Sequence, residues 1–110
     1  MTKRKQDLKS LRDEVAAGTW PGSDVYSHMS DRCASFAYDS FNGSLDAAMA
    51  LHKALLPDHR ARIDVGRRFR AWVITPSNKK NDAYSESPAR AWLLCILDAI
   101  IAREGQSDGL

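Results

Sequence analysis

The sequence lacks the residue patterns that most catalytic and metal-binding sites require. Its two cysteines, Cys33 and Cys95, lie far apart, and its three histidines show neither His-x-x-x-His nor His-Glu-x-x-His spacing. The sequence contains no Gly-x-x-x-x-Gly-Lys phosphate loop and no Gly-x-Ser-x-Gly nucleophile turn. We therefore predict that the protein is not an enzyme and holds no metal or cofactor. Catalysis by Cys33 or His52 is the weakest alternative.

Long apolar runs are also missing. No stretch approaches the roughly 18 apolar residues that a membrane-spanning helix needs. The N-terminal segment of residues 1–7 is rich in charge and is not followed by the apolar core of a signal peptide. We therefore expect a cytoplasmic protein without a membrane partner, in which both cysteines are buried free thiols.

Charge is present but nearly balanced. The 110 residues include 16 Lys or Arg and 14 Asp or Glu, and this net charge of +2 is too small to indicate nucleic-acid binding by itself. The hydrophobic fraction of 44% and the charged fraction of 27% are typical of a globular protein. The length predicts one domain over residues 1–110, with disorder at residues 1–5 and 105–110.

Hydrophobic periodicity predicts four helices, at residues 6–17, 25–40, 45–56 and 88–103. Asp24 is expected to cap the second helix and Ser44 the third. Leu45 and Met49 are assigned to the buried side of the third helix. Ser87-Pro88 supplies the N-cap and the first helical residue of the fourth.

His52 falls in the middle of the apolar side of the third predicted helix. One interpretation is a buried acid, base or ligand. The interpretation that we favour is a histidine at the edge of the core, hydrogen-bonded to a backbone carbonyl. No second histidine follows four residues later, as a metal pair on one helix would require.

Alternation of apolar and polar residues predicts an antiparallel hairpin of residues 60–65 and 69–75. A two-residue turn would mix both kinds of side chain on each face. A three-residue loop pairs Ile63 with Ala71 and Val65 with Phe69, and we expect these four side chains on the buried face.

The segment between this hairpin and the last helix is polar. Residues 75–86 are expected to form a surface loop, with a third strand near residues 83–85 because a two-stranded sheet is only marginally stable. Helices and a small antiparallel sheet together indicate an α+β fold.

The last predicted helix is apolar almost all round. Arg90 and Asp98 form its polar strip, and Leu94 and Ile101 lie between them. A helix without a polar face is either buried by its own chain or lies at an interface. We expect self-association through Arg90, Leu94, Asp98 and Ile101, giving a homodimer, and the alternative is cover by the N-terminal helices.

Five arginines lie within eleven residues of the hairpin: Arg60, Arg62, Arg67, Arg68 and Arg70. Three of them share the outer face of the predicted sheet with Trp72. Arginines bind phosphates through paired hydrogen bonds, and an aromatic ring between them stacks on a base. This pattern favours an anionic partner. The alternative is an ordinary solvated face, on which Asp64 pairs with Arg70 and Arg62 with Trp72.

Three motifs follow one another in the second half of the chain. They are Ser-Leu-Asp-Ala-Ala from Ser44, Arg-Ala-Trp from Arg70, and Ser-Pro-Ala from Ser87 with an apolar run containing Cys95. This order resembles the phage ABA sandwich domain, a family of small bacteriophage proteins, over roughly residues 41–104. The resemblance implies an α-β-α layered sandwich encoded by a phage or prophage and located in the bacterial host cytoplasm. It supplies no catalytic residue.

These observations predict a non-enzymatic phage or prophage accessory protein that acts by contacts with a host or phage protein. One form of that role is inhibition of a host defence complex. The alternative is a small nucleic-acid-binding module that uses the arginine-rich hairpin. A structural or assembly role comes third.

Overall fold

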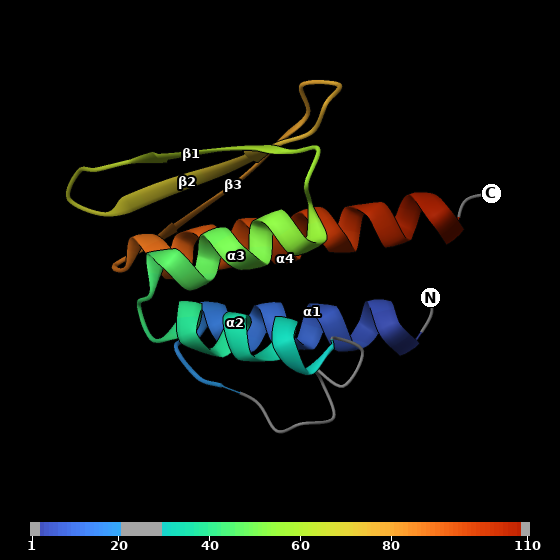
Figure 1. Ribbon diagram of the computed structural model, residues 1–110, viewed down its shortest axis with the longest axis horizontal. Coiled ribbons are helices and arrows are strands. Elements are labelled where there is room, and N and C mark those ends of the chain that lie inside the picture. Colours follow the sequence, from blue (N-terminus) through green and yellow to red (C-terminus); the bar gives the residue numbers. More distant parts are fainter. Residues whose placement is uncertain (1–2, 21–29, 109–110) are drawn as a thin grey trace.

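The computed structural model describes residues 3–20 and 30–108, which form four helices and one sheet (Figure 1). In chain order the elements are α1 (Lys3–Ala16), α2 (Asp31–Phe41), α3 (Leu45–Leu55), β1 (Arg60–Asp64), β2 (Phe69–Ile74), β3 (Lys80–Ser85) and α4 (Pro88–Asp108). The strands form an antiparallel sheet in the order β1-β2-β3. The predicted α+β class is confirmed.

The helix α4 lies at the centre of the molecule. It packs against β2 and β3 on one side and against α1, α2 and α3 elsewhere, and its residues 91–97 are all buried. Figure 1 shows the sheet on one side of α3 and α4, and the pair α1 and α2 on the other. The described layers therefore run sheet, helices, helices, which differs from the α-β-α order implied by the phage resemblance. Because α4 is apolar all round, the middle position is the one that buries it.

Serine side chains cap three of the helices. At the start of α4, Ser87 accepts a hydrogen bond from the backbone N–H of Arg90 at 3.3 Å, which confirms the predicted cap. Ser44 accepts a hydrogen bond from the backbone N–H of Ala47 at 3.1 Å, which confirms the predicted cap of α3. Ser30 accepts in the same way from the N–H of Cys33 at 3.2 Å, so α2 begins later than the predicted residue 25. The cap predicted at Asp24 lies outside the described residues.

The packing of α3 differs from the predicted one in part. Leu45 and Met49 are 43% and 45% exposed, so their assignment to the buried side is wrong. The helix packs against α2 and α4, and the buried residues of α3 are Ala47, Ala48, Leu51 and His52. The apolar residues of α3 therefore extend beyond the side that these two neighbours cover.

Two helices are longer than predicted. The helix α1 begins at Lys3 and α4 continues to Asp108, within stretches for which we expected disorder. Gly105 does not end α4, because one glycine inside a helix costs only about 1 kcal/mol. The preceding turns of α4 are held by packing on both sides.

The pairing of β1 with β2 follows the predicted register, with Ile63 opposite Ala71. Val65 is the exception, because β1 ends at Asp64 and Val65 is 80% exposed in the loop of residues 65–68. Its predicted pairing with Phe69 on the buried face is therefore wrong. The helix α4 covers β2 and β3 far more than β1, so burial does not hold Val65 in the sheet.

A full third strand lies in the segment predicted to be a polar loop. β3 spans Lys80–Ser85, and only residues 75–79 connect it to β2. In this turn the N–H of Thr75 donates to the carbonyl of Lys79 at 2.8 Å, and Asn78 adopts a left-handed backbone with φ 68°. The predicted strand near residues 83–85 was too short because the outward side chains of β3 are polar, like those of a loop.

Candidate binding surface on the outer face of the sheet

The sheet face that points away from α4 carries three rows of side chains. Across β1, β2 and β3 the rows are Arg60, Ile74 and Lys80; Arg62, Trp72 and Asp82; and Asp64, Arg70 and Tyr84. Strand alternation places these residues opposite the buried Ala71, Val73 and Ala83, and we call this side the outer face. Four predicted site residues, Arg60, Arg62, Arg70 and Trp72, thus lie on one surface.

An alternating row of arginines and aromatic rings crosses the outer face. The guanidinium carbon of Arg62 lies 5.2 Å from the centre of the Trp72 ring. That of Arg70 lies 4.4 Å from the Trp72 ring and 5.1 Å from the Tyr84 ring. These distances are those of cation–π contacts. We call Arg62, Trp72, Arg70 and Tyr84 the arginine–aromatic cluster, and it spans all three strands.

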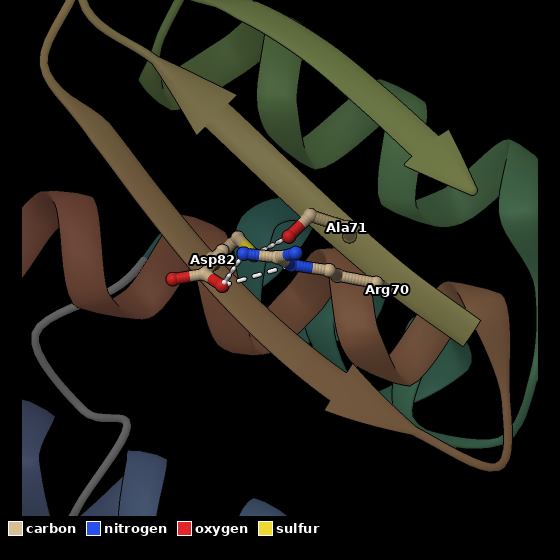
Figure 2. Close-up of polar contacts among 4 residues, drawn as sticks. Arg70, Ala71 and Asp82 are labelled. Carbon is tan, nitrogen blue, oxygen red and sulfur yellow. Dashed lines mark hydrogen bonds and ion pairs between the residues drawn. The ribbon is translucent and has the colours of Figure 1, made fainter. Parts of the chain in front are cut away.

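Two carboxylates hold the arginines of this cluster. Arg70 donates from Nε and Nη2 to Oδ2 of Asp82, at 3.0 and 2.6 Å, and Figure 2 shows the side chain reaching from β2 to β3. This hydrogen bonding raises the pKa of Arg70. Arg62 donates to Oδ1 of Asp64 at 3.1 Å. Asp64 lies opposite Arg70 as predicted, but the ion pair of Arg70 is with Asp82.

The remaining predicted arginines stand at the two ends of the outer face. Arg67 and Arg68 are exposed in the loop of residues 65–68. At the opposite end, Arg60 donates from Nη2 to Oδ1 of Asn78 at 2.8 Å, and Lys80 occupies the same row as Arg60. Cations therefore stand on both sides of the arginine–aromatic cluster.

Three residues of this surface were missed from the sequence, namely Lys80, Asp82 and Tyr84. Their positions depend on β3, which is longer than predicted. Strand alternation is the sequence signal that could have placed these three residues on one face. They are separated by Asn81 and Ala83, which face α4. Tyr84 is 50% exposed and adds a second ring to the surface.

Positive charge is concentrated in the sheet. Residues 60–86 contain seven Lys or Arg and three Asp or Glu, a net charge of +4, whereas the remainder of the chain carries −2. The overall charge of +2 hides this asymmetry. A basic surface on an otherwise acidic protein attracts polyanions to that surface.

The polar strip of α4, for which we predicted self-association, is partly covered by the chain itself. Asp98 accepts a hydrogen bond from Nε of Arg12 in α1 at 2.9 Å, and Arg90 donates to the carbonyl of Phe41 at 3.0 Å. Leu94 is 4% exposed and Ile101 is half-buried. These contacts are those expected of cover by the N-terminal helices. Self-association through the strip stays a prediction.

His52 has the backbone partner that we predicted. Its side chain is buried, and Nε2 lies 2.8 Å from the carbonyl oxygen of His59. The indole N–H of Trp92 donates to Nδ1 at 3.2 Å. Both ring nitrogens are therefore engaged in hydrogen bonds within the core.

Cys33 and Cys95 are buried free thiols, as predicted. The thiol of Cys95 donates to the carbonyl of Ala71 at 3.0 Å, and burial raises the pKa of Cys95 to about 12. Within residues 3–20 and 30–108, no three His, Cys, Asp or Glu side chains lie together as a metal site would require.

No helix in the described part of the chain is long and apolar enough to cross a membrane. Comparisons with protein-family models, with curated proteins and with solved structures find no match. The resemblance to the phage ABA sandwich domain therefore stays a prediction. The arguments for function come from the surfaces of the protein itself.

Proposed function

We propose that this protein binds single-stranded nucleic acid through the outer face of the sheet. The observation that carries the proposal is the arginine–aromatic cluster, on the sheet face that no described helix covers. Bases that are not paired stack on aromatic rings and on guanidinium planes, and arginines also bind phosphates. The cluster offers both kinds of contact on one surface.

A single strand suits this face better than a duplex. The faces of bases inside a duplex are stacked on each other, so only unpaired bases can lie against Trp72 or Tyr84. Strands of six residues are about 20 Å long, which gives room for a few nucleotides. Asp82 is the carboxylate nearest the centre of the face, and Arg70 neutralises it.

The test is fluorescence anisotropy with a labelled oligothymidylate of about 12 nucleotides, titrated with protein at low and moderate salt. We expect binding whose log K falls linearly with log salt concentration, because phosphate contacts release counterions. Tyr84→Ala removes one stacking platform and should weaken binding about tenfold or more. Arg62→Gln should weaken binding and reduce the salt dependence.

The helical side of the molecule supplies matched controls. Tyr38 on α2 is 48% exposed, close to the exposure of Tyr84, and Arg32 lies 5.5 Å from the Phe36 ring in a similar cation–π contact. Tyr38→Ala and Arg32→Gln should leave the affinity unchanged. The proposal fails if no salt-dependent binding is seen, or if control and sheet variants lose affinity equally.

A protein partner is the second candidate function. Tryptophan, tyrosine and arginine dominate the energetically important positions of protein interfaces, and the cluster consists of these three types. This candidate agrees with the accessory protein predicted from the sequence, an inhibitor of a host defence complex being one form. The net charge of +4 over residues 60–86 favours nucleic acid over it. A protein captured by the wild type and lost with Trp72→Ala, without oligonucleotide binding, would support the second candidate.

A further inference from the structure

A hollow lies between the 75–79 turn and the C-terminal half of α4, on the opposite side of the sheet from the cluster. Its volume is about 630 Å³, within the range of small-molecule sites. Ala99 and Ala102 of α4 and Pro76 of the turn form its apolar part. The short alanine side chains leave this space open.

Basic side chains stand around the hollow. Lys79 comes from the turn and Arg103 from α4, while Lys80, whose side chain belongs to the outer face, lines the hollow at the start of β3. Arg103 is anchored by a hydrogen bond from Nη1 to the carbonyl of Leu55 at 3.1 Å. None of the described residues that line the hollow carries a carboxylate. The hollow therefore combines two positive charges, those of Lys79 and Arg103, with an apolar floor.

His59 adds a buried polar atom to this wall. Its Nδ1 is shielded from solvent and has no hydrogen-bond partner among the described residues. Buried polar atoms are nearly always hydrogen-bonded, so an unpaired one beside a hollow indicates a missing partner. Burial, with the charges of His52 and Arg103, lowers the pKa of His59, and Asp58 acts in the opposite direction.

We propose that this hollow binds a small organic phosphate of the nucleoside monophosphate class. Lys79 and Arg103 would hold the phosphate, whose oxygens accept charge-assisted hydrogen bonds. Nδ1 of His59 would donate a further hydrogen bond, and Ala99 and Ala102 would contact the flat apolar part of the ligand. The hollow is separate from the arginine–aromatic cluster, so the proposal does not depend on oligonucleotide binding.

The test is an NMR titration of the His59 imidazole, assigned with His59→Gln, using adenosine 5′-monophosphate, inorganic phosphate and adenosine. We expect a saturable shift with the monophosphate, weaker binding of phosphate, and no saturable shift with adenosine. The pKa of His59 should rise in the complex, because a neighbouring anion favours the charged imidazole.

Variants that each remove one positive charge distinguish specific binding in the hollow from nonspecific electrostatic attraction of the anion. Lys79→Gln and Arg103→Gln should each weaken the monophosphate about tenfold, since each removes a charged hydrogen-bond donor. The Lys79 variant keeps the backbone hydrogen bonds that close the turn, so it tests the site without disturbing the fold. Lys53→Gln, on the exposed side of α3, removes the same charge and should have no effect.

Three results would overturn the proposal. They are no saturable His59 shift with the monophosphate or phosphate up to about 10 mM, binding of adenosine as tight as the monophosphate, or equal weakening by Lys53→Gln. Tyr84→Ala distinguishes the two surfaces, because it should weaken the oligonucleotide and leave the monophosphate titration unchanged. Failure of either proposal is therefore visible without reference to the other.

Discussion

The indole N–H of Trp92 donates a hydrogen bond to Nδ1 of His52 at 3.2 Å, and this bond determines the tautomer of the histidine. Because Nδ1 accepts, the proton of the neutral ring lies on Nε2 and is donated to the carbonyl oxygen of His59, 2.8 Å away. The contact therefore joins α4 to α3 and, through His59, to the start of β1. His52 acts as a structural link between these three elements.

Trp92→Phe should destabilise the protein because it leaves Nδ1 of the 7% exposed His52 without its donor. We expect a loss of about 1–3 kcal/mol in the free energy of unfolding, measured by urea denaturation. Trp72→Phe, on the open sheet face, makes the same chemical change and should cost less. Equal losses in the two variants would show that the hydrogen bond to His52 contributes nothing.

Local features of this fold were predictable because they depend on residues close in sequence. The Ser44 cap, the hairpin register at Ile63 and Ala71, and the backbone partner of His52 are examples. The order of layers was not predictable from such patterns. It depends on which elements cover each side of α4, and periodicity shows only that α4 needs cover all round.

The candidate binding surface was likewise predictable only in part. Arg62, Arg70 and Trp72 belong to one hairpin, so alternation alone placed them on a shared face. Tyr84 and Asp82 lie on that face only because β3 pairs with β2. The sequence of a mostly polar edge strand does not predict such a pairing. Val65 shows the opposite error, since the apolar pattern continued beyond the point where α4 covers the sheet.

The turn between β2 and β3 can be tested at Asn78, whose φ is 68°. Asn78→Ala should destabilise the protein by about 1 kcal/mol relative to Asn78→Gly, because a Cβ atom disfavours the left-handed region and glycine does not meet this penalty. Both variants lose the acceptor for Arg60, so their difference in thermal unfolding isolates the backbone effect. Equal stability of the two variants would contradict a strained turn.

The thiol of Cys95 should be inert in the folded protein. Its pKa of about 12 leaves roughly one thiolate in ten thousand at pH 8, and the thiolate is the reactive form. In a Cys33→Ala variant, iodoacetamide at pH 8 should leave Cys95 unmodified by mass spectrometry until urea unfolds the chain. Modification of the native variant at the rate of the unfolded one would show that Cys95 is accessible.

His59 should make stability depend on pH just below neutrality. Its pKa in the folded protein is lowered from 6.5, so between that lower value and 6.5 the unfolded chain binds more protons than the folded one. The free energy of unfolding therefore rises with pH across this window. The contribution of His59 to stability is lost as the pH falls through it.

The variant His59→Gln removes this titration while keeping a polar side chain at the position. Urea unfolding at pH 7.5 and pH 5.5 should show a smaller loss of stability on acidification for the variant than for the wild type. The difference cannot exceed about 1.4 kcal/mol per pH unit, the limit for one proton. A parallel loss in the two proteins would mean that His59 has the same pKa folded and unfolded, and that neither its burial nor the charge of Arg103 affects its titration.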